Sequence, residues 1–136
     1  MEKYKVGFVC VGNSCRSQMS EGYAREYAED LFDVYSAGTK PSEQVKPNAV
    51  EVMQEEGIDI SSQYPKKLEE IPSELDILIT MGCDVECPFI PCEYRNDWDL
   101  DDPAGKSIEE FRKIRDIIKN NVKNLIEMVK QDEILE

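Results

Sequence analysis

The segment Cys10-Val-Gly-Asn-Ser-Cys-Arg16-Ser17 carries the residue types in this chain that are best suited to chemistry. A loop between a strand and a helix can turn successive backbone N–H groups toward one point, where they bind an oxyanion. The arginine side chain holds two oxygens of a tetrahedral anion at once, a geometry that lysine does not match. We therefore expect an oxyanion site built by Val11, Gly12, Asn13, Ser14, Cys15 and Arg16.

Cys10 opens this loop and is the candidate nucleophile. The positive field of Arg16 and of a helix N-terminus, which would hold an anion, also stabilises a thiolate. Ser17 is placed to donate a hydrogen bond to the sulfur. The chain contains no histidine, so neither a Ser-His-Asp nor a Cys-His relay operates within it, and this nucleophile needs none. The alternative is that Cys10 ends a buried strand as a small apolar residue.

A second candidate is Asp102, within Trp98-Asp-Leu-Asp-Asp-Pro-Ala-Gly105. A carboxyl group near the oxyanion site would act as a general acid for a leaving oxygen. Taken alone, an Asp-Pro pair in an acidic loop is typical of a turn. The functional interpretation of Asp102 depends on its lying near Cys10.

Three further cysteines, Cys83, Cys87 and Cys92, follow the first two, Cys10 and Cys15. From spacing alone they are incidental thiols, metal ligands or redox cysteines. A zinc site would have three thiolates and no histidine, which leaves the fourth ligand unassigned. Thiols a few residues apart can form a disulfide where the intervening loop meets the required geometry. We expect Cys15 to be structural, with its side chain in the core.

The charge balance excludes several partners. The chain has 16 basic and 29 acidic residues and a formal net charge of −13, which repels nucleic acid and anionic lipid. Most of the excess lies in residues 69–136. The sequence contains neither a signal peptide pattern nor an apolar run of the roughly 20 residues that span a membrane. We therefore expect a cytoplasmic protein with reduced thiols.

The elements that must position these residues follow from hydrophobic patterning. We expect strands at 5–10, 32–36 and 74–81, with a short one near 94–97. Helices are expected from Arg16 to about Leu31, from Pro47 to about Glu56, at 61–68, and from a capping box, Ser107-Ile-Glu-Glu110, to about Val129. Alternation of strands and helices predicts one α/β domain over residues 1–136, with a parallel sheet whose carboxyl ends carry the site.

At these residues the chain resembles the low-molecular-weight tyrosine phosphatase superfamily and, more narrowly, its thioredoxin-coupled arsenate reductases. The resemblance covers essentially the full length. The anion loop continues as Ser17-Gln18-Met19-Ser20-Glu21-Gly22, where the phosphatase branch typically has proline in place of Gln18. Further matching segments are Tyr35-Ser-Ala-Gly38, Asp59-Ile-Ser61 and Asp102-Pro-Ala-Gly-Lys106. The resemblance implies a three-layer fold with a four-stranded parallel sheet flanked by helices.

The resemblance also implies roles for named residues. Cys10 would attack arsenate held by the loop and Arg16, and Asp102 would correspond to the general acid of the phosphatases. Cys83 resembles the thiol that attacks the Cys10–arsenic adduct. Cys87 resembles the one that moves the resulting disulfide outward to thioredoxin. The order of these two thiols is open, because better-known members space them more widely, and Cys92 competes for the same role.

Electron counting separates the competing functions. Reduction of As(V) to As(III) takes two electrons, and two thiolates that become one disulfide supply two, whereas a phosphatase needs only Cys10 and water. The leading hypothesis is an arsenate reductase; the alternatives are a phosphatase for phosphotyrosine or small phosphoesters, and an oxyanion-binding or redox-sensing module. We expect a monomer without cofactor or metal, with arsenate or phosphate as ligand and thioredoxin as reductant.

Overall fold

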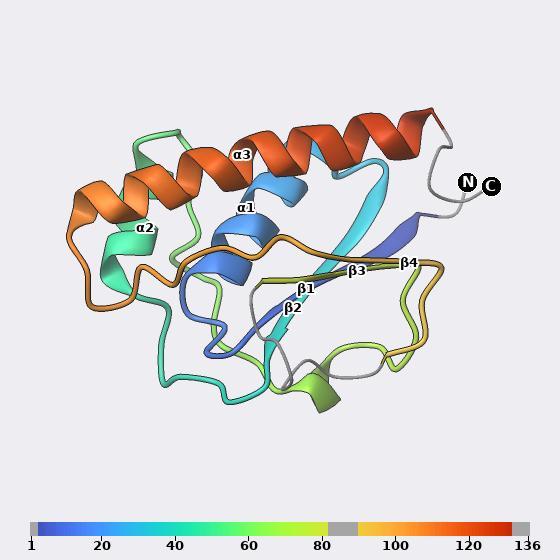
Figure 1. Cartoon of the computed structure of the whole chain (residues 1–136), viewed down its shortest axis with the longest axis horizontal. Coiled ribbons are helices and arrows are strands. Elements are labelled where there is room, and N and C mark those ends of the chain that lie inside the picture. Colours follow the sequence, from blue (N-terminus) through green and yellow to red (C-terminus); the bar gives the residue numbers. More distant parts are fainter. Residues whose placement is uncertain (1–2, 82–89, 132–136) are drawn as a thin grey trace.

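The computed structural model of this 136-residue chain describes residues 3–81 and 90–131. It consists of a parallel sheet, three α-helices and one short 3₁₀-helix, η1 (Figure 1). The elements follow one another as β1 (Tyr4–Cys10), α1 (Arg16–Ala28), β2 (Phe32–Gly38), α2 (Pro47–Gln54), η1 (Leu68–Glu70), β3 (Ile77–Thr80), β4 (Tyr94–Asp97) and α3 (Ile108–Lys130).

The four strands form one sheet in the order β2-β1-β3-β4, with every neighbouring pair parallel. Val6 in β1 lies opposite Val34 in β2 and Ile77 in β3, and Ile77 in turn lies opposite Tyr94 in β4. This confirms the predicted α/β fold with a four-stranded parallel sheet. Since parallel strands end at one edge of a sheet, Cys10 and Met81, the residue after β3, lie at the same edge.

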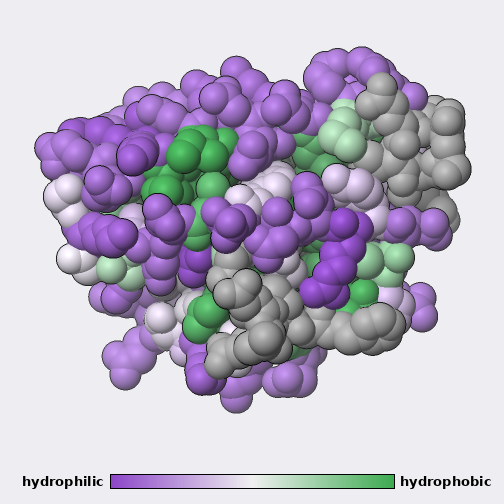
Figure 2. Space-filling view, in the orientation of Figure 1, coloured by the Kyte–Doolittle hydropathy of each residue, from purple (hydrophilic) through white to green (hydrophobic). Residues whose placement is uncertain are grey.

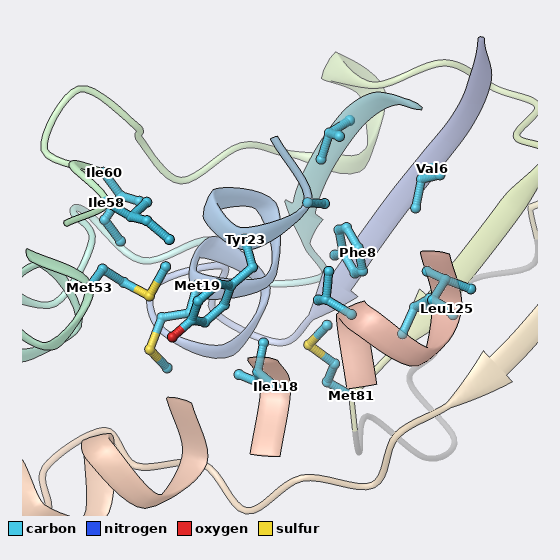
Figure 3. Packing of buried hydrophobic residues seen from close by; sticks show 14 of the residues in the cluster. Val6, Phe8, Met19, Tyr23, Met53, Ile58, Ile60, Met81, Ile118 and Leu125 are labelled. Atoms are coloured by element: carbon cyan, nitrogen blue, oxygen red, sulfur yellow. The ribbon is translucent and has the colours of Figure 1, made fainter. Parts of the chain in front are cut away.

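One face of the sheet is covered by the α-helices. Phe8 of β1 is fully buried there against residues of α1 and α3, among them Met19, Tyr23 and Ile118 (Figure 3). Figure 1 shows α3 running across α1, which itself lies on the sheet. Alternate residues of each strand point to this side, as expected for a buried sheet.

The opposite face is covered by η1 and by loop segments rather than by an α-helix of the described residues. Val9, Ala37 and Leu78 form its sheet side, and Ile71 and Leu75 pack onto them. The approach is close: a Cβ atom added at Gly7 would lie 2.5 Å from Leu75 Cδ1. The three predicted layers are therefore present: the α-helices, the sheet, and a thin layer formed by η1 and the loop segments that pack on this face.

Helix α3 carries the predicted apolar stripe along one side. Its buried residues recur at steps of three and four and face the core: Phe111, Ile114, Ile118, Val122, Leu125, Ile126 and Val129. Hydrophilic residues cover most of its outer surface (Figure 2). Within residues 3–81 and 90–131, this helix included, no helix is both long enough and apolar enough to cross a membrane.

The predicted capping box of α3 is wrong in its hydrogen bonds. Ser107 is the N-cap residue, as expected, but its side chain caps no backbone N–H. Glu109 and Glu110 lie in the first turn, where their charge favours the helix N-terminus. The start of the helix was therefore predicted correctly, although the cap itself does not form.

The predicted helix at residues 61–68 is also wrong. The segment is a turn followed by extended chain, and only Leu68–Glu70 forms a 3₁₀-helix. Pro65 has no N–H to donate to a helical ladder, and the backbone groups of Tyr64 and Lys66 bond to α1, to the loop after β1 and to β2 instead. Tertiary partners thus replace the i→i−4 bonds that a helix would need.

Candidate active site

The loop from Cys10 to Arg16, here called the anion loop, joins the carboxyl end of β1 to the first residue of α1. Its carbonyl groups turn away from the loop centre toward the segment after β2. The carbonyls of Cys10, Val11, Gly12 and Ser14 accept hydrogen bonds from the backbone N–H groups of Thr39, Lys40, Ser42 and Lys46, respectively, at 3.2, 2.8, 2.9 and 2.9 Å. Among the described residues, the N–H groups of residues 11–15 have no carbonyl partner. The loop therefore keeps a set of backbone donors for a ligand.

Gly38 permits this close approach of the two segments. A Cβ atom at Gly38 would lie 2.6 Å from the carbonyl oxygen of Val11 and 3.0 Å from the backbone nitrogen of Asn13. Both of those atoms are backbone, so neither can move aside without distorting the loop. The end of β2 thus sets the shape of the anion loop.

Asn13 holds the centre of the loop. Its φ of 50° lies in the left-handed region, and the residue is fully buried. Its side-chain oxygen Oδ1 accepts from the backbone N–H of Lys66 at 2.8 Å and lies 3.1 Å from Nε2 of Gln18. With Oδ1 committed to these donors, the amide nitrogen Nδ2 points to Ser17 Oγ at 2.7 Å. The network assigns the orientation of the Asn13 amide.

The same network reaches the candidate nucleophile, Cys10, through Ser17. Ser17 Oγ lies 2.9 Å from Cys10 Sγ, and it accepts from Asn13. A thiolate carries no hydrogen, so when Cys10 is in its thiolate form Ser17 donates its hydroxyl hydrogen and the sulfur accepts. A donor aimed at the sulfur stabilises the thiolate form. Both residues are buried, Cys10 at 2% exposure and Ser17 at 0%.

Arg16 is buried and presents one edge of its guanidinium without a hydrogen bond. Nη1 donates to the carbonyl oxygens of Met81 and Leu100. The other edge consists of Nε, which is buried and unpartnered, and Nη2, which lies 3.6 Å from Asp102 Oδ2. An arginine binds two oxygens of an anion through an edge of this kind. A buried donor without a partner is costly unless a ligand satisfies it.

Asp102 lies beside the anion loop, although it is far from it in the sequence. This proximity was the condition for interpreting Asp102 as a functional residue. Its Oδ1 accepts from the N–H of Ala104 at 3.0 Å, which closes a turn, and its Oδ2 faces Arg16. The carboxyl group is 53% exposed, so it can exchange protons with water. Both sequence interpretations of Asp102 hold together: it forms a turn, and it lies beside the anion loop.

The side chain of Cys15 points into the core, as predicted. Its side chain is 2% exposed and belongs to the main core. Burial away from water raises the pKa of the Cys15 thiol to about 11. Cys15 therefore stays protonated at neutral pH, and its sulfur lies 3.6 Å from Ser14 Oγ within the loop.

Two of the three later cysteines, Cys83 and Cys87, lie outside the described residues, and their predicted redox roles stay predictions. Cys92 is described. It precedes β4 and lies at the amino end of the sheet, packed against the thin layer, whereas Cys10 lies at the carboxyl end. Tyr94 is in register with Val6 of β1 through Ile77. Cys92 precedes Tyr94 by two residues and Cys10 follows Val6 by four, so the two cysteines are offset by about six residues, or about 20 Å along the strand direction. Cys92 is therefore too far away to attack a group on Cys10.

Three residues that support the anion loop were not identified from the sequence as doing so. Gln18 is fully buried and donates to the carbonyl oxygens of Asn13 and Tyr64 at 3.0 and 2.9 Å. Gln63 fixes Gln18 through a bond of 2.7 Å to Oε1. Lys66 bonds to Asn13 through its backbone. Gln18 had a sequence signal, as a branch marker, but Gln63 and Lys66 are distant in sequence and had none.

Comparisons with known proteins identify relatives of this chain. Residues 5–134 match the family model of the low molecular weight phosphotyrosine protein phosphatases. The arsenate reductase of Staphylococcus aureus (strain Newman) is 41% identical over 128 residues, which cover 91% of this chain and 97% of the relative.

Solved structures show the same fold. An arsenate reductase in the phosphate binding state has a TM-score of 0.80 and 40% identity, covering 90% of this chain and 96% of its own. The thioredoxin-dependent arsenate reductase of Corynebacterium glutamicum has a TM-score of 0.80 and 29% identity, covering 96% of this chain and 63% of the larger relative.

Proposed function

Because this chain belongs to the low molecular weight phosphotyrosine protein phosphatase family, we propose that it is the kind of member that reduces arsenate to arsenite. One observation carries the proposal: the unpartnered, buried Nε of Arg16 shares a loop with free backbone donors and with the Cys10 sulfur. Such a set of donors is suited to a tetrahedral oxyanion beside a nucleophile. The arsenate reductases among the similar proteins support arsenate as that oxyanion.

The first step is attack of the Cys10 thiolate on arsenic. A sulfur–arsenic bond forms, and one arsenate oxygen leaves as water after it takes up a proton. Asp102 supplies that proton, since its carboxyl group lies beside Arg16 and is open to solvent. The loop N–H groups and the Nε–Nη2 edge of Arg16 hold the remaining oxygens throughout.

The second step is the reduction. The thiolate of Cys83 attacks the Cys10 sulfur, a disulfide forms, and the sulfur–arsenic bond breaks with its electron pair on arsenic. Two thiolates lose two electrons, and As(V) becomes As(III), which leaves as arsenite. Cys87 then attacks the Cys10–Cys83 disulfide, so Cys10 is released as a thiolate and a Cys83–Cys87 disulfide remains. A dithiol protein, thioredoxin, reduces that disulfide by the same exchange chemistry.

This relay is proposed from the chemistry of the thiols and from the resemblance of Cys83 and Cys87 to the relay cysteines of thioredoxin-coupled reductases. The thioredoxin-dependent relative from Corynebacterium glutamicum supports thioredoxin as the reductant. Thioredoxin-linked chemistry needs a reducing compartment, so we expect the enzyme to work in the cytoplasm. The relay uses only protein thiols, and we propose that the enzyme works as a monomer without a resident cofactor.

Hydrolysis of phosphoesters is a second candidate function. Its favouring observation is Asp102, placed beside Arg16, because a general acid helps an alcohol or phenol leave from phosphate. Cys10 would then form a phosphocysteine that water hydrolyses. This reaction needs no thiol besides Cys10.

The two functions are separated by a coupled assay. Reduced protein is incubated with arsenate, thioredoxin, thioredoxin reductase and NADPH, and NADPH consumption is followed beside hydrolysis of an aryl phosphate. We expect arsenate-dependent NADPH consumption. Its absence, together with rapid aryl phosphate hydrolysis, would overturn arsenate reduction in favour of the phosphatase.

Cysteine variants test the relay in the same assay. Cys10→Ser should abolish both activities, a loss on the order of 10⁴-fold, because a neutral hydroxyl replaces the thiolate. Cys83→Ser and Cys87→Ser should each stop thioredoxin-linked turnover and spare hydrolysis. Cys92→Ser is the matched control and should retain full turnover, since Cys92 lies at the other end of the sheet. Normal turnover in both Cys83→Ser and Cys87→Ser would refute the internal relay.

A further inference from the structure

Glu21 is the only carboxylate among the buried polar residues of the described chain, and neither reaction above uses it. It lies on α1, one turn after Ser17. Its oxygens accept from Ser36 Oγ at 2.5 Å and from Arg25 Nε at 2.9 Å, and the Lys66 ammonium lies 3.7 Å away. A buried carboxylate needs such partners, because an uncompensated charge in the interior is strongly destabilising.

Lys66 holds its position through three side-chain contacts. Its Nζ donates to the carbonyl oxygen of Tyr64 at 2.8 Å, lies 4.7 Å from the centre of the Tyr64 ring, and pairs with Glu21. The side chain is 14% exposed, so the ion pair is shielded from most solvent screening. These contacts tie residues 64–66 to helix α1.

The backbone of Lys66 continues this link to the anion loop. Its carbonyl oxygen accepts from the N–H of Gly38 at 2.9 Å, and its own N–H donates to Asn13 Oδ1 at 2.8 Å. That second bond is one of those that turn the Asn13 amide so that Nδ2 faces Ser17. Ser17 in turn uses its hydroxyl hydrogen for Cys10.

We propose that Lys66 is a positioning residue for the nucleophile: its buried ion pair with Glu21 fixes the backbone donor that orients Asn13, and through Ser17 it keeps a hydrogen bond on the Cys10 sulfur. The inference rests on the proposed role of Cys10 as the reacting thiolate. Lys66 itself touches neither the sulfur nor the oxyanion. Loss of its ammonium removes one of the contacts that hold residues 64–66, beside the bonds from Gln18 and Gly38, and so weakens a donor to the thiolate.

Arg25 provides a matched control for this proposal. It contacts the same carboxylate from the same helix, and its other bond goes to the carbonyl of Val34. None of its contacts given by the structure reaches Asn13 or residues 64–66. Replacing Arg25 removes a cation from Glu21 and leaves the path to Cys10 in place.

The experiment is the rate of Cys10 carboxamidomethylation by iodoacetamide between pH 5 and pH 10, measured on the Cys10 peptide by mass spectrometry. We expect Lys66→Met to react about 5-fold more slowly at pH 7, because hydrogen bonds to charged groups are among the stronger ones, and to reach the unmodified protein's rate at high pH. Arg25→Met should stay within about 2-fold at every pH. Lys66→Arg, which keeps the cation, should recover most of the rate.

Two results would overturn the proposal. One is an unchanged alkylation profile in Lys66→Met, and the other is an equal shift in Arg25→Met, which would assign the effect to charge on Glu21 rather than to the link to Asn13. Thermal unfolding checks that the variants are folded. If Lys66→Met is unfolded, Lys66→Gln, which retains a donor for Tyr64, must show the same pH-dependent slowing in smaller degree, and a normal profile there overturns the proposal.

Alkylation uses no arsenate, so this test is independent of the proposed function. A failure of the unmodified protein to reduce arsenate would overturn that function and leave the role of Lys66 standing. Conversely, an unchanged profile in Lys66→Met would remove the role of Lys66 and leave arsenate reduction standing.

Discussion

The anion loop and the loop at residues 98–105 meet at Arg16, yet they are held in opposite ways. The anion loop is buried, and four of its carbonyl groups are bound by the chain after β2. The loop at 98–105 is more exposed, and Asp102 is fixed only by its own turn and by Arg16. The first loop is built to hold charge without reorganising, whereas the second keeps a carboxyl group in contact with water for proton transfer.

This contrast indicates which substitutions should affect both stability and catalysis, and which should affect catalysis alone. In the buried loop, the donors that bind an anion are also the scaffold, so substitutions there should affect both folding and turnover. In the exposed loop, a side chain can lose its chemistry at little cost to folding. Arg16 connects the two loops. It ends the anion loop, its Nη1 donates to the carbonyl oxygen of Leu100 in the loop at 98–105, and its buried Nε carries no hydrogen bond.

The largest effect should come from Arg16→Lys, which breaks the connection between the loops. Lysine keeps the charge, but it lacks the two-donor edge and cannot also bond to Met81 and Leu100. We expect turnover of arsenate to fall about 10³-fold, with a lower melting temperature by calorimetry. Arg25→Lys on the same helix is the control. Turnover within 10-fold of normal would show that the guanidinium edge is not required.

The next effect tests the exposed loop alone. Asp102→Asn removes the proton donor and should slow hydrolysis of an aryl phosphate about 100-fold. Stability should change by less than about 1 kcal/mol, because the pair with Arg16 is solvent-exposed on one side. Asp101→Asn, at the neighbouring exposed position, should leave the rate unchanged. A loss of stability above that value in urea unfolding would contradict the contrast between the loops.

Glycine substitutions compare the two regions directly. Gly38→Ala places a Cβ atom 2.6 Å from the Val11 carbonyl oxygen, and should cost about 2 kcal/mol of unfolding free energy as well as much of the activity. Gly105→Ala has open space around it and only a positive φ of 80° to strain it, so it should cost about 1 kcal/mol and spare activity. Equal effects of the two variants on turnover would contradict the proposed difference between the anion loop and the loop at 98–105.

The smallest effect concerns pH and the buried loop. Burial raises the pKa of Cys15 to about 11 from a reference value of 9.0, so the folded state retains a proton that the unfolded state loses first. This contribution is complete below pH 9 and is lost as the pH rises toward 11, an alkaline destabilisation of about 2 kcal/mol. Cys15→Ala should show a shallower alkaline decline in urea unfolding.

Burial also raises the pKa of Tyr23. That contribution is the same in the unmodified protein and in Cys15→Ala, so it cancels in the difference between their unfolding free energies. Cys15 should also resist iodoacetamide in the native state at pH 8, where Cys10 reacts. Parallel stability profiles of the two proteins from pH 8 to pH 11, or rapid native alkylation of Cys15, would count against a purely structural Cys15.

The sequence predicted the elements with strong patterns more reliably than those with weak ones. The apolar stripe of α3 and the buried run of β1 specify their structures through their own periodicity. Helix α1 ends at Ala28, before the predicted Leu31, because the chain turns there to begin β2. The helix predicted at 61–68 does not form, since its backbone groups serve Gln18, Asn13 and Gly38, partners that no local pattern reveals.

What the sequence determined by itself is the chemistry of the anion loop. Cys10, Asn13, Arg16 and Ser17 lie within eight consecutive residues, so one strand–loop–helix turn places them together whatever surrounds it. What only the tertiary structure decided is every partner from farther along the chain. The parallel register brings Asp102 to Arg16 and moves Cys92 to the other end of the sheet. Lys66 meets Glu21 and Asn13 because the thin layer crosses the end of β2. These distances depend on packing between elements, which residue spacing does not encode.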